Sequence, residues 1–260
     1  MLEIAKENGK TVNQSIVQSF KASAEQEYKK TKATKLTFLD LFKTPILRRN
    51  VLLMIINWSL TSILFDAHIR NLDSLEYSIY WTFTISSFIE LPADLLSIWG
   101  LEIIGRRWSA VFSLLAFSLT MFVSTIIIDN VLWLTILAML GRGFITYSMN
   151  TAAQISFEVV PTELRGQGTA LANVFAQASM FFAPQVVFSR TFDFRLPFII
   201  LGFGSGLAGI FALFLPETAN TKLPDTIAET NELYEQNGCC VVRRKSVKLE
   251  NNQAVKPESV

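Results

Sequence analysis

The sequence predicts an all-α membrane protein, a bundle of six membrane-spanning helices, and three observations lead to this fold class. Of the 260 residues, 50% are hydrophobic and only 17% are charged, whereas about 25% is usual in soluble domains. The charges crowd into residues 1–50 and 218–260, and the middle of the chain is apolar in blocks of about 20 residues, the length that crosses a hydrocarbon core. These blocks are continuous and do not alternate like the strands of a membrane barrel, so helices are expected to satisfy the backbone in lipid.

The apolar segments follow one another through residues 46–217, and the short loops between them carry Gly, Pro, Asn or Asp. We predict spans at 50–68, 74–100, 109–128, 131–160, 166–189 and 196–215. The second and fourth are long enough to tilt or to extend past the bilayer. Gly105 and Pro161 are expected to end the helices before the third and fifth spans. The flanks, 1–45 and 218–260, are predicted to be the cytosolic part of a central loop and a cytosolic, disordered tail.

Lysine and arginine orient these spans. If the spans alternate in direction, seven basic residues fall on one side of the membrane: Lys43, Arg48, Arg49, Arg106, Arg107, Arg165 and Lys222. The other side has three: Arg70, Arg190 and Arg195. Basic loops stay in the cytosol, so both termini are predicted to be cytosolic. An even number of spans also requires the two termini to share one side.

Residue content argues against several other classes of function. A net charge of +1 gives no reason to expect a nucleic-acid partner. Neither a disulfide framework nor a zinc site follows from Cys239 and Cys240, which are either palmitoylated or part of a solvated tail. The sequence has one histidine, no metal-ligand cluster and no Gly-x-x-x-x-Gly-Lys-Ser/Thr motif for ATP, so we expect no enzyme, metal site or cofactor. The histidine, His68, is expected to be a surface or capping group at the outer end of the first span.

Five local motifs carry a family resemblance. They read Leu-Phe-Lys-Thr-Pro (41–45) with Leu-Arg-Arg-Asn (47–50), Glu-Leu-Pro-Ala (90–93), Glu-Ile-Ile-Gly-Arg-Arg (102–107), Glu-Val-Val-Pro-Thr-Glu-Leu-Arg-Gly (158–166), and Leu-Pro-Glu-Thr (215–218) with Leu-Pro-Asp-Thr (223–226). In this order and spacing they resemble the solute carrier 22 family of organic cation, anion and carnitine transporters, within the major facilitator superfamily. The resemblance covers about residues 2–233 and corresponds to helices seven to twelve of a twelve-helix plan.

The resemblance implies gradient-driven transport of small organic ions or zwitterions across the plasma membrane. Its partners would be the lipid bilayer, the organic ion, and either the missing N-terminal half or a full-length transporter. We expect a half-length or truncated form, and a fragment, an incomplete gene model and a true isoform all stay open. The alternative function is a membrane protein that does not transport but modulates a full-length partner.

Charged motif residues gather at the predicted cytosolic helix ends. They are Glu102, Gly105, Arg106, Arg107, Glu158, Arg165 and Glu217. A carboxylate near a helix C-terminus is unfavourable against the helix dipole unless a cation compensates it, and an arginine fork can bind a carboxylate and a carbonyl together. We therefore expect Glu158 to pair with Arg106 or Arg107 in a network that holds an inner gate shut. The alternative is that these charges only anchor the topology.

Ionisable groups within a span are candidates for function. Glu90 lies about two-thirds of the way along the predicted second span and Arg142 about a third of the way along the fourth. The two spans run in the same direction, so Glu90 is expected nearer the cytosol and Arg142 nearer the outside, which leaves a direct pair open. For Arg142, a contact between helices is favoured over contact with substrate.

Neutral polar and aromatic side chains complete the candidate substrate path. In the resembling family, the position of Gln177 tends to be acidic in cation carriers and basic in anion carriers. Here Gln177 is neutral, and with Asn173 one turn earlier it offers amides to a polar or zwitterionic ligand; hydrogen bonding between helices is the alternative. Trp58, Tyr147 and Asn150 are expected to line the same cavity, where aromatic faces attract cations, or else to serve in packing.

Overall fold

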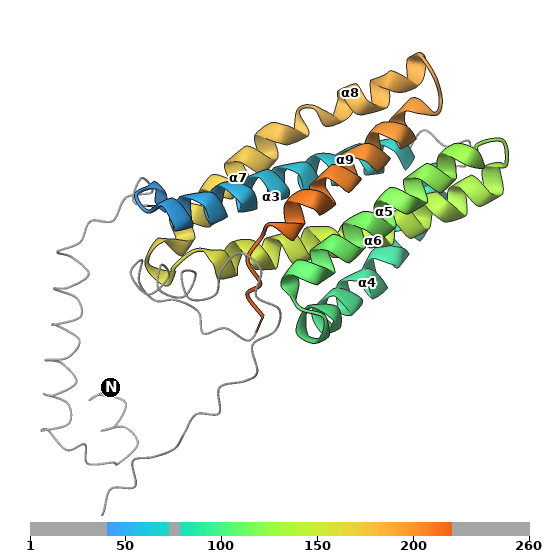
Figure 1. The fold of residues 1–260 in the computed structure, drawn as a ribbon. Helices are drawn as coiled ribbons and strands as arrows, with labels where there is room; N and C mark the ends of the chain where they lie inside the picture. The colour runs from blue at the N-terminus through green and yellow to red at the C-terminus, as the bar shows by residue number, and fades with distance from the viewer. Residues whose placement is uncertain (1–40, 73–78, 220–260) are drawn as a thin grey trace, which may run out of the picture. The chain divides into compact units, whose positions relative to one another are not determined.

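Helices account for all the regular structure in the computed structural model, which describes residues 41–72 and 79–219. Its helices are α3 (Pro45–Leu72), α4 (Ile79–Ile103), α5 (Arg106–Ile126), α6 (Val131–Val159), α7 (Arg165–Met180), α8 (Ala183–Phe188) and α9 (Leu196–Leu213) (Figure 1). Two 3₁₀ turns, η2 (Thr162–Leu164) and η3 (Ser189–Thr191), lie between them. The predicted all-α class is confirmed. The expectations for the first 40 residues, for Lys222 and the motif at 223–226, and for the two cysteines lie outside the described residues.

Five helical segments of the described chain are long and apolar enough to cross a membrane. They are α3, α5, α6, α9 and the stretch 162–191 that contains α7 and α8. α4 has a comparable length of 25 residues, but Glu90, Pro92 and Asp94 interrupt its apolar character. The predicted second span is therefore helical, but α4 is not among these five segments, and a six-span topology stays a prediction.

The predicted fifth span is not one continuous helix. α7 ends at Met180, Phe181 and Phe182 form a turn, and α8 begins at Ala183 with Pro184 in its first turn. Proline has no amide hydrogen for an intrahelical bond, and it is well tolerated only where a helix starts. Pro184 thus accounts for the break, which periodicity and hydropathy did not reveal.

α5 and α9 pack closely because their contact surface consists of small residues. The hydroxyl of Ser118 donates to the carbonyl oxygen of Gly202 at 2.8 Å, and Ser205 donates in the opposite direction to the carbonyl of Leu114. A Cβ on Gly202 would lie 3.1 Å from the ring of Phe122. Small residues and interhelical hydrogen bonds are the usual means of association where lipid removes the hydrophobic driving force.

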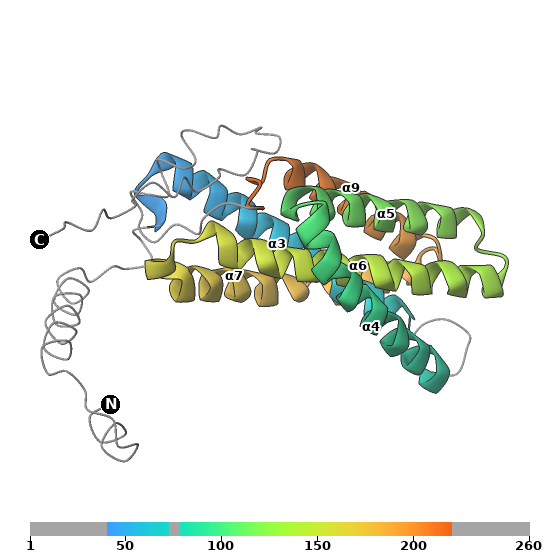
Figure 2. The same cartoon turned by 90° about the horizontal axis from the view of Figure 1, so that it is seen from below.

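The helices divide the bundle into two sides. α5 packs on α6 and α9, α3 packs on α6, α7 and α9, and α4 packs mainly on α6. Figure 2 shows α5 and α9 along one side of the bundle and α4 and α7 along the other, with α6 between them. Many side chains of α4 and α7 are exposed. Outer side chains of α5 and α9 are exposed too, among them Phe112, Leu119 and Phe203. The two sides differ in composition instead, since exposed polar residues lie within α4 and α7.

The expectation of a surface position for His68 is wrong. Its side chain is fully buried, with Nε2 3.1 Å from the carbonyl oxygen of Ala138 and the ring packed edge-on against Phe117 at 5.2 Å. The predicted span ended at residue 68, whereas α3 continues to Leu72. His68 thus lies a full turn inside the helix, where α3 meets α5 and α6.

Candidate functional site

The N-terminus of α5 is capped by a carboxylate that is distant in the sequence. Glu217, just beyond α9, accepts hydrogen bonds from the backbone amides of Arg106 at 2.9 Å and Arg107 at 3.3 Å. These amides have no partner within the helix, and the helix dipole favours a negative charge there. Gly105 precedes them with φ +94°, and a Cβ on it would lie 3.0 Å from the Glu217 carboxylate. Gly105 therefore ends α4 as predicted and leaves room for the cap.

The expected ion pair between Glu158 and Arg106 is present. Arg106 donates from Nε to both carboxylate oxygens, at 3.1 and 3.2 Å, and from Nη1 to the carbonyl oxygen of Leu101 at 3.2 Å. Glu158 is buried near the C-terminus of α6, and it also accepts hydrogen bonds from Gln154 at 2.8 Å and from the hydroxyl of Thr218. This group ties together α4, α5, α6 and the segment after α9.

Two of the predicted cytosolic residues lie apart from this group. Glu102 is exposed, and no ion pair joins it to the described part of the chain. Arg165 donates to the hydroxyl of Thr162 at 3.4 Å rather than to a carboxylate. The network also contains Gln154 and Thr218, which the motif analysis did not single out, although Gln154 lies one helical turn before Glu158.

Glu90 and Arg142 form an ion pair between α4 and α6, and the expectation that they lie at different depths is wrong. Glu90 is eleven residues from the start of α4 at Ile79, and Arg142 is eleven residues from the start of α6 at Val131. At about 1.5 Å per residue, both lie about 16 Å from the outer helix ends. Their direct contact places the two side chains at the same level of the bundle.

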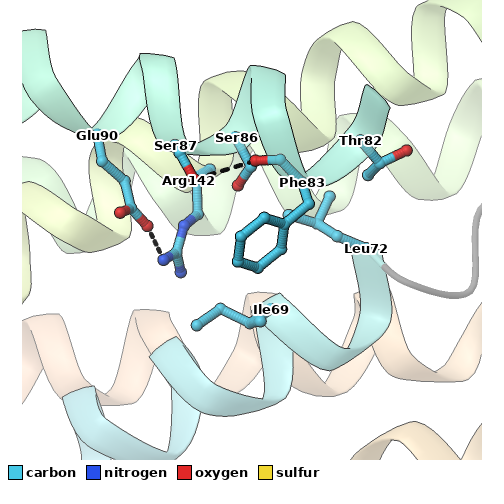
Figure 3. A pocket seen from close by; sticks show the side chains of 8 residues that line it. All are labelled: Ile69, Leu72, Thr82, Phe83, Ser86, Ser87, Glu90 and Arg142. Atoms are coloured by element: carbon cyan, nitrogen blue, oxygen red, sulfur yellow. Dashed lines mark hydrogen bonds and ion pairs between the residues drawn. The ribbon is translucent and has the colours of Figure 1, made fainter. Parts of the chain in front are cut away.

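The ion pair lines a cavity of about 160 Å³ towards the predicted outer end of α4. Its wall consists of Ile69, Leu72, Thr82, Phe83, Ser86, Ser87, Glu90 and Arg142 (Figure 3). Arg142 is only 4% exposed, and its guanidinium stacks on the ring of Phe65 at 4.2 Å. Its Nη2 binds Glu90, while Nε and Nη1 have no hydrogen-bond partner. A contact of Arg142 between helices, the favoured expectation, agrees with this arrangement.

The remaining substrate-path candidates do not line this cavity. Trp58 is buried among Ala152 and Ala176, and its position is one of core packing. Tyr147 donates to the hydroxyl of Ser109 at 3.1 Å. The amides of Gln177 and Asn173 are exposed on α7.

Asn150 binds Asp94, a residue that the sequence analysis missed. Its amide donates to Oδ1 of Asp94 on α4 at 2.7 Å and to the hydroxyl of Ser97 at 3.3 Å. Asp94 is an exposed carboxylate one turn after Glu90 within an apolar helix. An ionisable residue in a predicted span was the signal that could have identified it.

A comparison with protein families decides the membership of the chain. The model of the Major Facilitator Superfamily matches residues 50–253. The chain belongs to the Major Facilitator Superfamily. Its helical bundle is thus one of this superfamily.

Curated relatives of this superfamily protein are members of solute carrier family 22. Solute carrier family 22 member 6 of Pseudopleuronectes americanus is 30% identical over 84% of this chain and 39% of the relative. Organic anion transporter 3 of Oryctolagus cuniculus is 30% identical over 89% of the chain and 42% of the relative. Organic cation transporter 1 of Caenorhabditis elegans is 29% identical over 87% and 39%. The chain thus spans about two-fifths of the length of each of these relatives.

Proposed function

We propose that this chain forms one wall of a pathway that carries small organic ions or zwitterions across a membrane. The observation that carries the proposal is a set of polar side chains on the side of the bundle formed by α4, α6 and α7, at the middle of apolar helices: Asp94, Asn150, Asn173 and Gln177. Such groups are costly in lipid, so they are expected to face water, substrate or another protein segment.

The depth of these residues supports a shared site. Asp94 and Asn150 lie nine residues from the cytosolic ends of α4 and α6, about 14 Å at 1.5 Å per residue. Gln177 lies twelve residues from the start of α7, about 18 Å by the same measure. The middle of a hydrocarbon core is about 15 Å from either surface. Secondary transporters bind substrate near this plane, between two bundles.

We further propose that the cytosolic group around Glu158 acts as an inner gate. It joins α4, α5, α6 and the end of α9 in the arrangement described above, so a rocking motion that separates these helix ends has to break the pair of Arg106 and Glu158. Anchoring of the topology is the alternative role for Arg107 and Arg165, and both roles are compatible in one residue.

The other wall of the pathway would come from the N-terminal half of such a transporter or from a full-length transporter. We propose a multi-pass location in the plasma membrane with both termini in the cytosol, and transport driven by gradients rather than catalysis. The second candidate function is that of a membrane protein that does not transport but modulates a full-length partner.

Uptake into liposomes tests the proposal. The purified chain is reconstituted alone and with a full-length relative, and uptake of a radiolabelled cation, benzyltrimethylammonium, is compared with that of a similar-sized anion, benzenesulfonate. Transport by the chain alone or with the relative above the relative's own rate supports a pathway wall. Reduced uptake by the relative supports the modulating role, and an unchanged rate argues against both.

Exchange of Gln177 tests the site. Gln177→Asp is expected to shift the preference towards the cation and Gln177→Arg towards the anion, because either variant adds a charge at the middle of the wall. Gln185 on α8 is also exposed and lies two turns further out, so Gln185→Asp serves as the matched control. A preference unchanged in all three variants would remove Gln177 from the substrate path.

A further inference from the structure

We propose that Asp94 binds the positive charge of the substrate, so that the wall formed by α4, α6 and α7 selects organic cations over anions. This inference rests on the proposed transport function and adds a charge preference to it. The names of the relatives do not decide the matter, because they include an organic anion transporter and an organic cation transporter. The charged side chains on the wall of this chain decide the charge preference instead.

The charged groups at the middle of the described bundle leave one negative charge uncompensated. Glu90 and Arg142 neutralise each other as an ion pair. Asp94, one turn further along α4, receives its hydrogen bond from the neutral amide of Asn150. No basic side chain forms an ion pair with Asp94 among residues 41–72 and 79–219. The other polar groups of the wall, Asn173 and Gln177, are neutral as well.

The carboxylate of Asp94 is held in place and still accessible. Asn150 binds Oδ1 at 2.7 Å and also reaches the Ser97 hydroxyl, which in turn donates to the backbone carbonyl of Asp94 at 2.7 Å. These contacts restrict the side chain but involve only one of its two carboxylate oxygens. Oδ2 therefore remains to accept a hydrogen bond or a charge from outside the bundle, because the residue is exposed.

Contrast with Glu158 shows what a purely structural carboxylate in this bundle looks like. Glu158 is buried, and both its oxygens are used by Arg106, Gln154 and Thr218. Asp94 has neither the burial nor a cationic partner. A charge in a medium of low dielectric interacts strongly with any opposite charge that approaches it, and an intramembrane carboxylate without a partner is the group that an ammonium ion would neutralise.

The surroundings of Asp94 fit the rest of an organic cation. Leu91 and Ile98 are three residues before and four residues after it, on the adjoining strip of α4, and both are exposed apolar side chains. A ligand with one cationic group and an apolar body can therefore place its charge at Asp94 and its body along this strip. An anion of the same shape would meet an uncompensated negative charge.

Equilibrium binding to the full chain in lipid nanodiscs tests this inference apart from transport. The probes are radiolabelled benzyltrimethylammonium and benzenesulfonate, and the variants are Asp94→Asn, Asp94→Glu and Asp94→Lys. Asn at 94 keeps an oxygen for Asn150, so the contact between α4 and α6 survives while the charge is lost. Asp129→Asn is the matched control, since Asp129 is an exposed acidic residue in the loop between α5 and α6.

We expect Asp94→Asn to weaken cation binding about ten- to fiftyfold. This is the factor for the attraction between two opposite unit charges about 5 Å apart at an effective dielectric constant of about 30–50. Asp94→Glu should retain cation binding, Asp94→Lys should bind the anion instead, and Asp129→Asn should match the unaltered chain. Cation binding that is absent from the unaltered chain, or equal in Asp94→Asn, overturns the inference. So does an effect of Asp94→Asn that is confined to the pH dependence of uptake, which would make Asp94 a proton carrier.

The two proposals can fail separately. Cation binding that depends on Asp94 without uptake in liposomes supports the charge preference and contradicts transport by this chain. Uptake with the same ratio of cation to anion in the unaltered chain and in Asp94→Asn supports transport and overturns the role of Asp94.

Discussion

Removal of Arg106 should destabilise the bundle far more than removal of an exposed arginine. In Arg106→Gln the carboxylate of Glu158 stays buried, with the neutral donors Gln154 and Thr218 but without its cation. Breaking a buried ion pair by deleting one partner costs about 3–5 kcal/mol. Because Arg106 itself is 20% exposed and two neutral donors remain, we expect a cost at or just below the lower limit of this range, about 2–3 kcal/mol.

Thermal unfolding followed by tryptophan fluorescence measures this cost. With about 2–4 °C per kcal/mol for a chain of this size, the expected fall in Tm is about 5–10 °C. Arg70→Gln is the control, because its ion pair with Asp66 is within one helix and half-exposed; such pairs contribute about 0.5 kcal/mol or less. The double variant Arg106→Gln/Glu158→Gln should regain most of the lost stability, since no buried charge is left. Equal shifts for Arg106→Gln and Arg70→Gln, or no recovery in the double variant, would refute the reasoning.

Three further substitutions probe close contacts and the buried ion pair, each by thermal unfolding against the unaltered chain. Gly100→Ala places a Cβ 2.0 Å from the hydroxyl of Tyr147 and should cost about 1–3 kcal/mol by overpacking; Tyr147→Phe in the same chain should restore part of it, and no restoration would contradict the contact. Gly105→Ala puts a side chain at φ +94° and ψ 162°, a backbone conformation that almost only glycine adopts, and should cost about 1–3 kcal/mol; Gly105→Asn should lose as much, and an unchanged Tm in both variants would contradict the strain. Glu90→Gln leaves the nearly buried guanidinium of Arg142 without its anion and should cost about 3 kcal/mol, whereas unchanged stability would mean that the charge is compensated elsewhere.

Local sequence patterns were sufficient for the class of fold and for the cytosolic ion pair. In lipid, a continuous apolar run of membrane length can satisfy its backbone hydrogen bonds within one segment only as a helix. The motifs at two helix ends predicted to share one side of the membrane led to a pair of Glu158 with Arg106 or Arg107, and the structure has the pair with Arg106. Both inferences depend on residue type and order, which a sequence states directly.

Inferences that depend on the exact ends of helices were the ones that went wrong. The depth of Glu90 relative to Arg142 was estimated from the predicted ends of two helices, and the ion pair between them contradicts that estimate. α3 continues to Leu72 instead of ending at residue 68, and His68 is buried inside it. Each residue of error moves a side chain by 100° around the helix and 1.5 Å along it. Hydropathy varies too slowly along a chain to fix such boundaries.

Contacts between segments that are distant in the chain could not be predicted from the sequence either. The cap of α5 comes from Glu217, about 110 residues further along the chain, and no local pattern states which loop it will reach. Asp94 was overlooked for a different reason. It lies between Pro92 and a run of leucines, and only its exposed position and its bond to Asn150 show that its charge is not compensated.

Glu217 and Thr218 hold the segment after α9 against the rest of the bundle, and we call this pair of residues the latch. Two consecutive residues just after the last helix bind the start of α5 and the carboxylate at the end of α6. Any force that pulls on the chain beyond residue 219 is therefore transmitted first to these three hydrogen bonds, before it reaches α9. A chain cut after Pro216 would lose the latch entirely, whereas one cut after Ala219 would keep it. A binding partner or a modification that acts on the tail therefore has a direct mechanical route to the proposed gate.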